Sequence, residues 1–176
     1  MNIGETRKKI EEVLDIYRNR LDAIPDDLFM VTPPGGGWSY SEVYSHILQA
    51  TLGSTIAVEK CTLNNCVPTN KGRTFIGLMT LSFGKFPPFR VNTPKELAEK
   101  NPVRNITKEE AKNLIIKCRK RLDAITPLIR NSSKHKRIRH PRMGMLNAKQ
   151  WLKFILIHSE HHLKQLDRVE KKLQSR

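Results

Sequence analysis

Apolar residues recur at steps of three and four in four stretches of the chain, the pattern of amphipathic helices. The first stretch covers residues 3–24, and the second runs from about residue 39 to residue 63. The third begins at residue 107 and carries an apolar stripe as far as Ile129, and the fourth begins at residue 147. Four amphipathic helices of this kind predict an all-α fold, a four-helix bundle with its interior between the helices.

Three of the four stretches open with a capping box, in which Ser, Thr or Asn is followed three residues later by Glu or Gln. The pairs are Ser39 with Glu42, Thr107 with Glu110, and Asn147 with Gln150. Such a pair satisfies free backbone N–H groups of the first turn, so it indicates where a helix begins. In the third stretch, Pro127 predicts that the helix kinks or ends early.

The lengths of the connections predict the arrangement of the helices. The first and last connections take about a dozen residues each, which suits antiparallel neighbours. The middle connection, residues 64–106, is long enough for the second and third helices to run parallel. We therefore predict an up-down-down-up bundle, with a short helix within residues 75–86 covering one end. One domain over residues 1–176 is expected from the length.

Composition places the chain among ordinary globular proteins, since 38% of its 176 residues are hydrophobic and 28% are charged. The N-terminus lacks a signal-peptide pattern, and no apolar run approaches the roughly 20 residues of a membrane helix. We therefore expect a cytoplasmic protein without a membrane partner. Three cysteines without a C-x-x-C pair argue against a disulfide framework and against a thiolate zinc site.

The formal net charge of +15 favours contact with polyanions or anionic surfaces. Because the basic residues are spread along the chain, we interpret most of this charge as a solvated surface. The run Lys-His-Lys-Arg-Ile-Arg-His-Pro-Arg at residues 134–142 is denser, and it leaves nucleic-acid or polyanion binding by a basic loop as an alternative. No aromatic residue is interleaved in this run, which argues against the stacking of single-stranded bases.

Two histidines lie in the middle of the apolar stripe of the fourth predicted helix. On a helical wheel His162 falls about 40° from His158, and residues four apart can reach one metal ion. His46, on the inner side of the second helix, is the third candidate ligand. Hydrogen-bonded core histidines are the alternative, although burying several polar rings without partners is unfavourable by several kcal/mol.

Four more residues are candidates for the surroundings of this site. Glu42, one turn before the histidine of the second helix, either orients that imidazole or serves only its capping box. Gln165 either supports a ligand or packs in the core. His161 and His140 either line the mouth of a pocket or occupy an edge-of-core position and a turn, respectively. Since no Glu lies inside a His-Glu-x-x-His motif, the catalytic residues stay unknown.

Two parts of the chain resemble one known family. Residues 37–46, Gly-Trp-Ser-Tyr-Ser-Glu-Val-Tyr-Ser-His, resemble the helix-2 signature of the DinB-like (DinB/YfiT) superfamily. The His-Pro-Arg-Met-Gly element at residues 140–144, Gln150-Trp151 and residues 158–166 resemble its last helix. The His-Pro-x-x-Gly element before that helix suggests the subgroup of uncharacterised members that carry it.

The resemblance implies a metal ion, zinc or nickel, on His46, His158 and His162, and a metal-dependent enzyme acting on a small molecule. The reaction would be thiol S-transferase-like, with a low-molecular-weight thiol, or hydrolytic. Three imidazoles also suit iron or manganese, and they leave an open position on the ion as in catalytic zinc sites. A non-catalytic binding module is the alternative. Family members often dimerise, so a homodimer is also expected, whereas the strong basic charge departs from the family.

Overall fold

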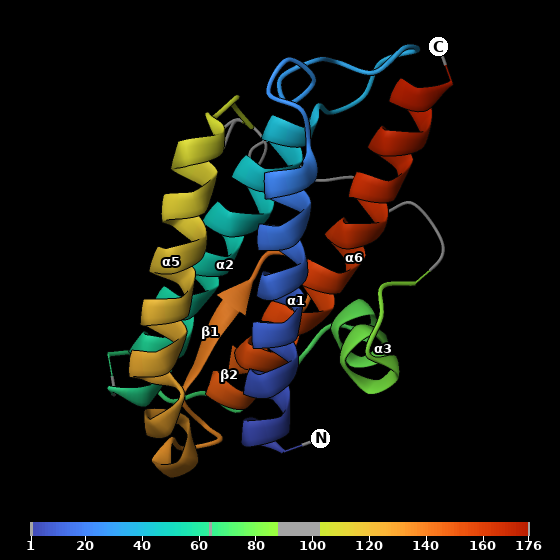
Figure 1. Ribbon diagram of the computed structural model, residues 1–176. Helices are drawn as coiled ribbons and strands as arrows, with labels where there is room; N and C mark the ends of the chain where they lie inside the picture. The colour runs from blue at the N-terminus through green and yellow to red at the C-terminus, as the bar shows by residue number, and fades with distance from the viewer. Residues whose placement is uncertain (1, 64, 88–102, 176) are drawn as a thin grey trace.

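Four long helices lie side by side in the computed structural model, which describes residues 2–63, 65–87 and 103–175 (Figure 1). The elements are α1 (Ile3–Ala23), α2 (Tyr40–Thr62), α3 (Phe75–Phe83), α5 (Lys108–Ile125), the 3-10 helix η1 (Pro127–Asn131), β1 (Arg137–His140), β2 (Gly144–Asn147) and α6 (Ala148–Gln174). The predicted helical bundle is confirmed. Of the predicted connection 64–106, residues 64 and 88–102 lie outside the described residues. None of the described helices is both long and apolar enough to span a bilayer.

The starts of the helices follow the predicted capping boxes. Ser39, Thr107 and Asn147 each accept a hydrogen bond from the backbone N–H three residues later, and the Glu or Gln at that position bonds back. Each box stabilises its helix by about 1 kcal/mol. Pro127 ends α5 two residues earlier, as predicted, and the apolar stripe continues into η1, where Ile129 is fully buried.

A two-stranded sheet corrects the prediction of an all-α chain and of a loop at residues 134–142. Strand β1 pairs antiparallel with β2, and Ile138 stands opposite Leu146. Leu146 is fully buried, and the indole N–H of Trp151 donates to the carbonyl of Ile138 at 3.3 Å. The hairpin therefore packs its apolar face on the start of α6. Its charged residues hid this pattern, because a single apolar residue in β1 gives no visible alternation.

Side-chain pairs between helices show their directions. Arg20, near the end of α1, forms ion pairs with Asp167 and with Glu170 near the end of α6 (2.9 Å to Glu170), so α1 and α6 run the same way. Lys112, early in α5, pairs at 3.0 Å with Asp22, late in α1, so these two helices are antiparallel. The contacts of α2 with α6, described below, are also antiparallel (Figure 1).

Two buried tyrosines connect α1 with α2 and α6. The hydroxyl of Tyr44 donates to the carbonyl of Tyr17 at 2.8 Å, and the hydroxyl of Tyr17 donates to the carbonyl of Ser159 at 2.9 Å. Their rings meet edge to face, with centroids 5.5 Å apart. Burial raises the pKa of both phenols, so both remain hydrogen-bond donors. These bonds fix the level of α6 relative to α1 and α2.

Gly144 permits the turn of the hairpin to lie directly on the segment before α3. Its φ is +79°, and a Cβ added there would lie 2.7 Å from the backbone nitrogen of Thr74. The N–H of Thr74 donates to the carbonyl of Met143 at 3.0 Å, and the N–H of Met145 donates to the carbonyl of Gly72 at 3.0 Å. Glycine is thus required at the last position of the His-Pro-x-x-Gly element for two reasons. The backbone has a positive φ there, and a side chain would overlap the backbone of Thr74.

We predict that Gly144→Ala lowers the free energy of unfolding by about 2–4 kcal/mol. The alanine would carry the strain of a positive φ and would overlap the backbone of Thr74. Urea unfolding followed by circular dichroism measures the change. Gly53→Ala is the matched control, because the space around helical Gly53 is open and alanine favours a helix by roughly 0.5–1 kcal/mol. Equal stability of the two variants would contradict this account of the turn.

Candidate metal centre

The three predicted ligands meet between α2 and α6. His46 lies in the second turn of α2, below the cap at Ser39, and His158 and His162 lie one turn apart near the middle of α6. The ring centroids of His46 lie 5.3 Å from those of His158 and 4.7 Å from those of His162. One ring nitrogen of each residue lies within 4.8 Å of the other two. Three imidazoles from two antiparallel helices therefore surround one small space.

The donor set fits a transition-metal ion. The Nε2 atoms of His158 and His162 are 3.1 Å apart, close to the edge of roughly 3.3 Å in a tetrahedron with metal–nitrogen bonds of about 2.0 Å. The Oε1 atom of Gln165 lies 2.7 Å from Nδ1 of His162. An amide oxygen only accepts, so Nδ1 carries the proton and the lone pair of Nε2 faces the shared space. Gln165 thus occupies the supporting position considered from the sequence.

All three imidazoles are held in the neutral form that binds metals. Burial lowers the pKa of His46, and to a smaller extent so does the nearby His161. Burial, followed by the proximity of the other rings, lowers the pKa of His158 well below its usual 6.5. For His162, burial is again the main cause and lowers the pKa to about 3. At neutral pH no proton competes for these nitrogens.

Aromatic rings enclose the three histidines. Trp38 stacks nearly parallel to His162, with centroids 6.3 Å apart, and lies 5.0 Å from His46. Phe154 stacks on His158 at 5.1 Å, and Phe86 lies 6.1 Å from the same ring. The sequence pattern did not place Trp38 among the residues predicted for this site. It gives no signal for Phe86, which the segment after α3 brings in.

Two other predicted residues lie near the histidines in different roles. Glu42 accepts hydrogen bonds from the backbone N–H of Ser39 at 2.8 Å and from its hydroxyl at 3.1 Å, and it makes no hydrogen bond to His46. His161 is exposed, and its ring lies 5.2 Å from that of His162. Glu42 is thus a capping residue in this structure, while His161 stands at the rim of the group.

His140 holds the turn of the hairpin. Its Nδ1 accepts hydrogen bonds from the backbone N–H groups of Arg142 and Met143, both at 3.2 Å. Its ring lies 4.5 Å from that of Phe154 and 5.3 Å from that of Trp151. Burial lowers the pKa of His140 to about 4. The structure therefore gives this residue the turn position that the sequence left open, one aromatic layer away from the three histidines.

Comparison with known families identifies the group to which the chain is related. A family model described as the DinB superfamily matches residues 9–166. The chain belongs to the DinB superfamily. This membership confirms the resemblance seen at residues 37–46 and 140–166. No curated protein matches the chain.

Three solved structures share the fold of this chain. The four-helix bundle protein TT2238 superimposes with a TM-score of 0.62 and 16% identity, over 95% of this chain and 99% of its own. YfiT from Bacillus subtilis, described as "a probable metal-dependent hydrolase with an unusual four-helix bundle topology", gives 0.62 and 15%, over 98% and 87%. The mycothiol-dependent maleylpyruvate isomerase gives 0.56 and 13%, over 93% and 60%. At such identities the likeness shows the fold.

The pKa of His140 predicts an acid-sensitive DinB fold. Between pH 6.5 and pH 4 the unfolded chain binds a proton at this imidazole and the native chain does not, so stability falls as the pH falls. The free energy of unfolding should therefore fall between pH 7 and pH 5. We expect His140→Gln to make this fall smaller by on the order of 1 kcal/mol. Urea unfolding at the two pH values measures it. His135→Gln, the same change at an exposed histidine, is the control; if the two variants lose stability equally, His140 is not the group responsible.

Proposed function

We propose that this DinB-superfamily protein holds one divalent metal ion on His46, His158 and His162 and uses it in a reaction of a small molecule. The observation that carries the proposal is the 3.1 Å approach of two Nε2 atoms, with Gln165 holding the proton of His162 on its far nitrogen. Zinc or nickel is the expected ion, because both take imidazole ligands. Iron and manganese are the alternatives.

The surroundings suit reactive chemistry. A bound divalent ion would supply a Lewis acid with an open coordination position, which lowers the pKa of a water or thiol there. Trp38 and Phe86 pack against the ligands and reduce their contact with water, which strengthens electrostatic interactions at the site. His161 stands at the rim. Partial desolvation, and then the charges of Arg168 and Lys164, lower its pKa, so the ring is neutral and has a lone pair for the proton of an entering substrate.

The first candidate reaction is the transfer of a low-molecular-weight thiol, and hydrolysis is the second. Among the described residues, the group that could hold a metal contains three histidines and no carboxylate. Metal-assisted hydrolysis in His-Glu-x-x-His enzymes uses a Glu as general base, whereas a thiolate is itself the nucleophile. Relatives of this fold are described as metal-dependent in one case and mycothiol-dependent in another, which supports both kinds of chemistry.

We extend the proposal to the organisation of the chain. Residues 1–176 form one domain, supported by the family match over residues 9–166. The connectivity is up-down-down-up, supported by the directions of the ion-paired helices. Membership of the His-Pro-x-x-Gly subgroup is supported by the turn at residues 140–144, in which the backbone N–H of Arg142 donates to Nδ1 of His140. A homodimer stays a prediction, and a non-catalytic binding module is the outcome to which failed activity assays would point.

Purified protein is expected to bind about one transition-metal ion per chain, which elemental mass spectrometry measures after dialysis. The double variant His158→Ala, His162→Ala should bind none, because it retains one imidazole. Gln165→Ala should bind the same ion about 10–100-fold more weakly, since the orientation of the His162 ring is lost. His135→Ala, at an exposed histidine in the turn before β1, should bind as the wild type does. Equal metal content of the wild type and the double variant would refute the site.

The metal-loaded protein is expected to consume a low-molecular-weight thiol in the presence of an activated electrophile, and a chelator should abolish the reaction. His161→Gln should lower kcat at least about tenfold while the bound metal is retained, if its ring accepts the thiol proton. Loss of free thiol, followed with a thiol reagent, measures the rate. Metal-dependent ester hydrolysis without thiol consumption would instead favour the second candidate reaction.

A further inference from the structure

The basic residues of this chain are spread along it, but its acidic residues are absent from two long segments. Residues 60–95 contain six Lys and Arg, and residues 124–159 contain eight. Neither segment contains Asp or Glu, so together they account for 14 of the 15 net charges. The rest of the chain is close to neutral. Long segments without any acidic residue are expected at a surface that meets negative charge.

The fold brings these two segments together at the end of the bundle where the hairpin lies. The backbones of Pro68 and Lys136 form an isolated antiparallel β-bridge, and so do those of Arg73 and Gly144. The backbone N–H of Thr69 donates to the carbonyl of His135 at 2.9 Å. Residues 65–74 of the first segment and the hairpin of the second therefore lie side by side, next to the start of α3 (Figure 1).

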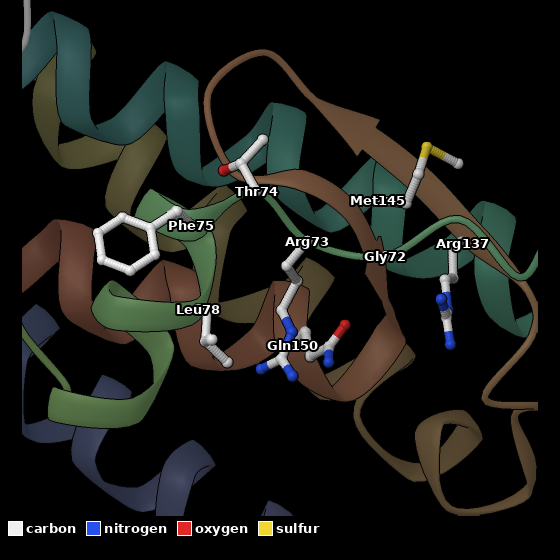
Figure 2. A pocket seen from close by; sticks show the side chains of 8 residues that line it. All are labelled: Gly72, Arg73, Thr74, Phe75, Leu78, Arg137, Met145 and Gln150. Atoms are coloured by element: carbon white, nitrogen blue, oxygen red, sulfur yellow. The ribbon is translucent and has the colours of Figure 1, made fainter.

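A half-open groove of about 380 Å³ lies on this surface (Figure 2). It is lined by Gly72, Arg73, Thr74, Phe75, Leu78, Arg137, Met145 and Gln150, and none of them is acidic. Gln150 is eight residues before His158 on α6, so the groove is about 12 Å along that helix from the proposed metal site. It is therefore a separate site.

Two arginines of the groove are available to an anion in different ways. Arg73 is exposed and makes no side-chain hydrogen bond or ion pair with another described residue. Arg137 is held in place, because its Nε donates to the carbonyl of Lys134 at 2.9 Å and its Nη1 to that of Lys71 at 2.5 Å. Its Nη2 is left for a ligand. Figure 2 shows the side chains of Arg73 and Gln150 next to each other, with Arg137 along the groove.

An aromatic ring stands beside these donors. Phe75 is 73% exposed and lines the same groove, and Leu78 is 45% exposed one turn later. The basic run at residues 134–142 has no aromatic residue of its own, and the fold supplies one from the start of α3. The groove thus combines an exposed ring with guanidinium groups that pair with no carboxylate among the described residues, and such groups bind a base and its phosphate in single-stranded nucleic acids.

We propose that this groove binds single-stranded nucleic acid, with Arg73 and Arg137 on successive phosphates and a base stacked on Phe75. The charge of the two acid-free segments attracts the strand, and the groove holds it without reading its sequence. A base paired within a duplex could not present its face to Phe75. Phe83 is also exposed, at 66%, but does not line the groove. Comparing substitutions at Phe75 and Phe83 therefore distinguishes base stacking in the groove from apolar contact elsewhere on the surface.

The test is fluorescence anisotropy with a labelled oligothymidine of about 12 nucleotides, its duplex with oligoadenosine, and vesicles containing anionic lipid. We expect the single strand to bind more tightly than the duplex. Phe75→Ala should weaken single-strand binding about tenfold, and Phe83→Ala should leave it unchanged. Arg73→Ala should weaken it and reduce the slope of log K against log salt by about 0.7, the value for one phosphate contact. Lys9→Ala, at an exposed lysine of α1, is the control for net charge.

Three results would overturn the proposal. One is equal weakening by Arg73→Ala and Lys9→Ala, since binding would then follow net charge alone. Another is a duplex that binds as tightly as the single strand with no effect of Phe75→Ala. The third is tighter binding to vesicles that Phe75→Ala and Phe83→Ala reduce alike, which would identify a membrane surface instead. Both phenylalanines are exposed, so circular dichroism should show that every variant is folded.

Discussion

Three imidazole rings, one buried and two half-buried, share one space between α2 and α6, and this arrangement requires that all three are neutral. Burial and mutual proximity lower the pKa of each ring, so the group is neutral and rich in lone pairs. Such a group needs a proton donor or a cation among its nitrogens. Gln165 satisfies the outer nitrogen of His162, and the hydrogen bond from Tyr17 to Ser159 sets the level of α6. The packing of α2 against α6 therefore brings the three rings together.

The parts of this structure that the sequence predicts are local. Capping boxes at residues 39–42, 107–110 and 147–150 place three helix starts, and the spacing of His158 and His162 places two imidazoles on one face. Apart from the meeting of His46 with His158 and His162, contacts between distant segments were not predicted. Phe86 contacts the ring of His158, and Phe75 lines the same groove as Arg137, because of the fold of the long connection, whose sequence has no periodicity that would predict it. The strands β1 and β2 were missed because each is only four residues long, and β1 has a single apolar residue among basic ones.

The basic end of the molecule does not disfavour a divalent ion at the histidines. At about 12 Å, two unit charges interact by only about 0.3 kcal/mol in water, and salt at physiological concentration screens most of that. Helix α6 contributes to both regions, with Gln150 at the groove and His158 and His162 two to three turns later. Aromatic residues, among them Phe154, separate the enclosed nitrogen ligands from the solvated arginines. Helix α6 thus contributes both to the histidine site between the helices and to the solvated basic groove.

The most direct test of the metal centre is a crystal structure of the protein grown with zinc, with diffraction recorded on both sides of the zinc absorption edge. The account predicts one strong anomalous peak between α2 and α6, about 2.0–2.1 Å from Nε2 of His158, Nε2 of His162 and one ring nitrogen of His46. No peak there, with the two Nε2 atoms still in hydrogen-bond contact, would mean that the three histidines are core residues and that the proposed function is wrong.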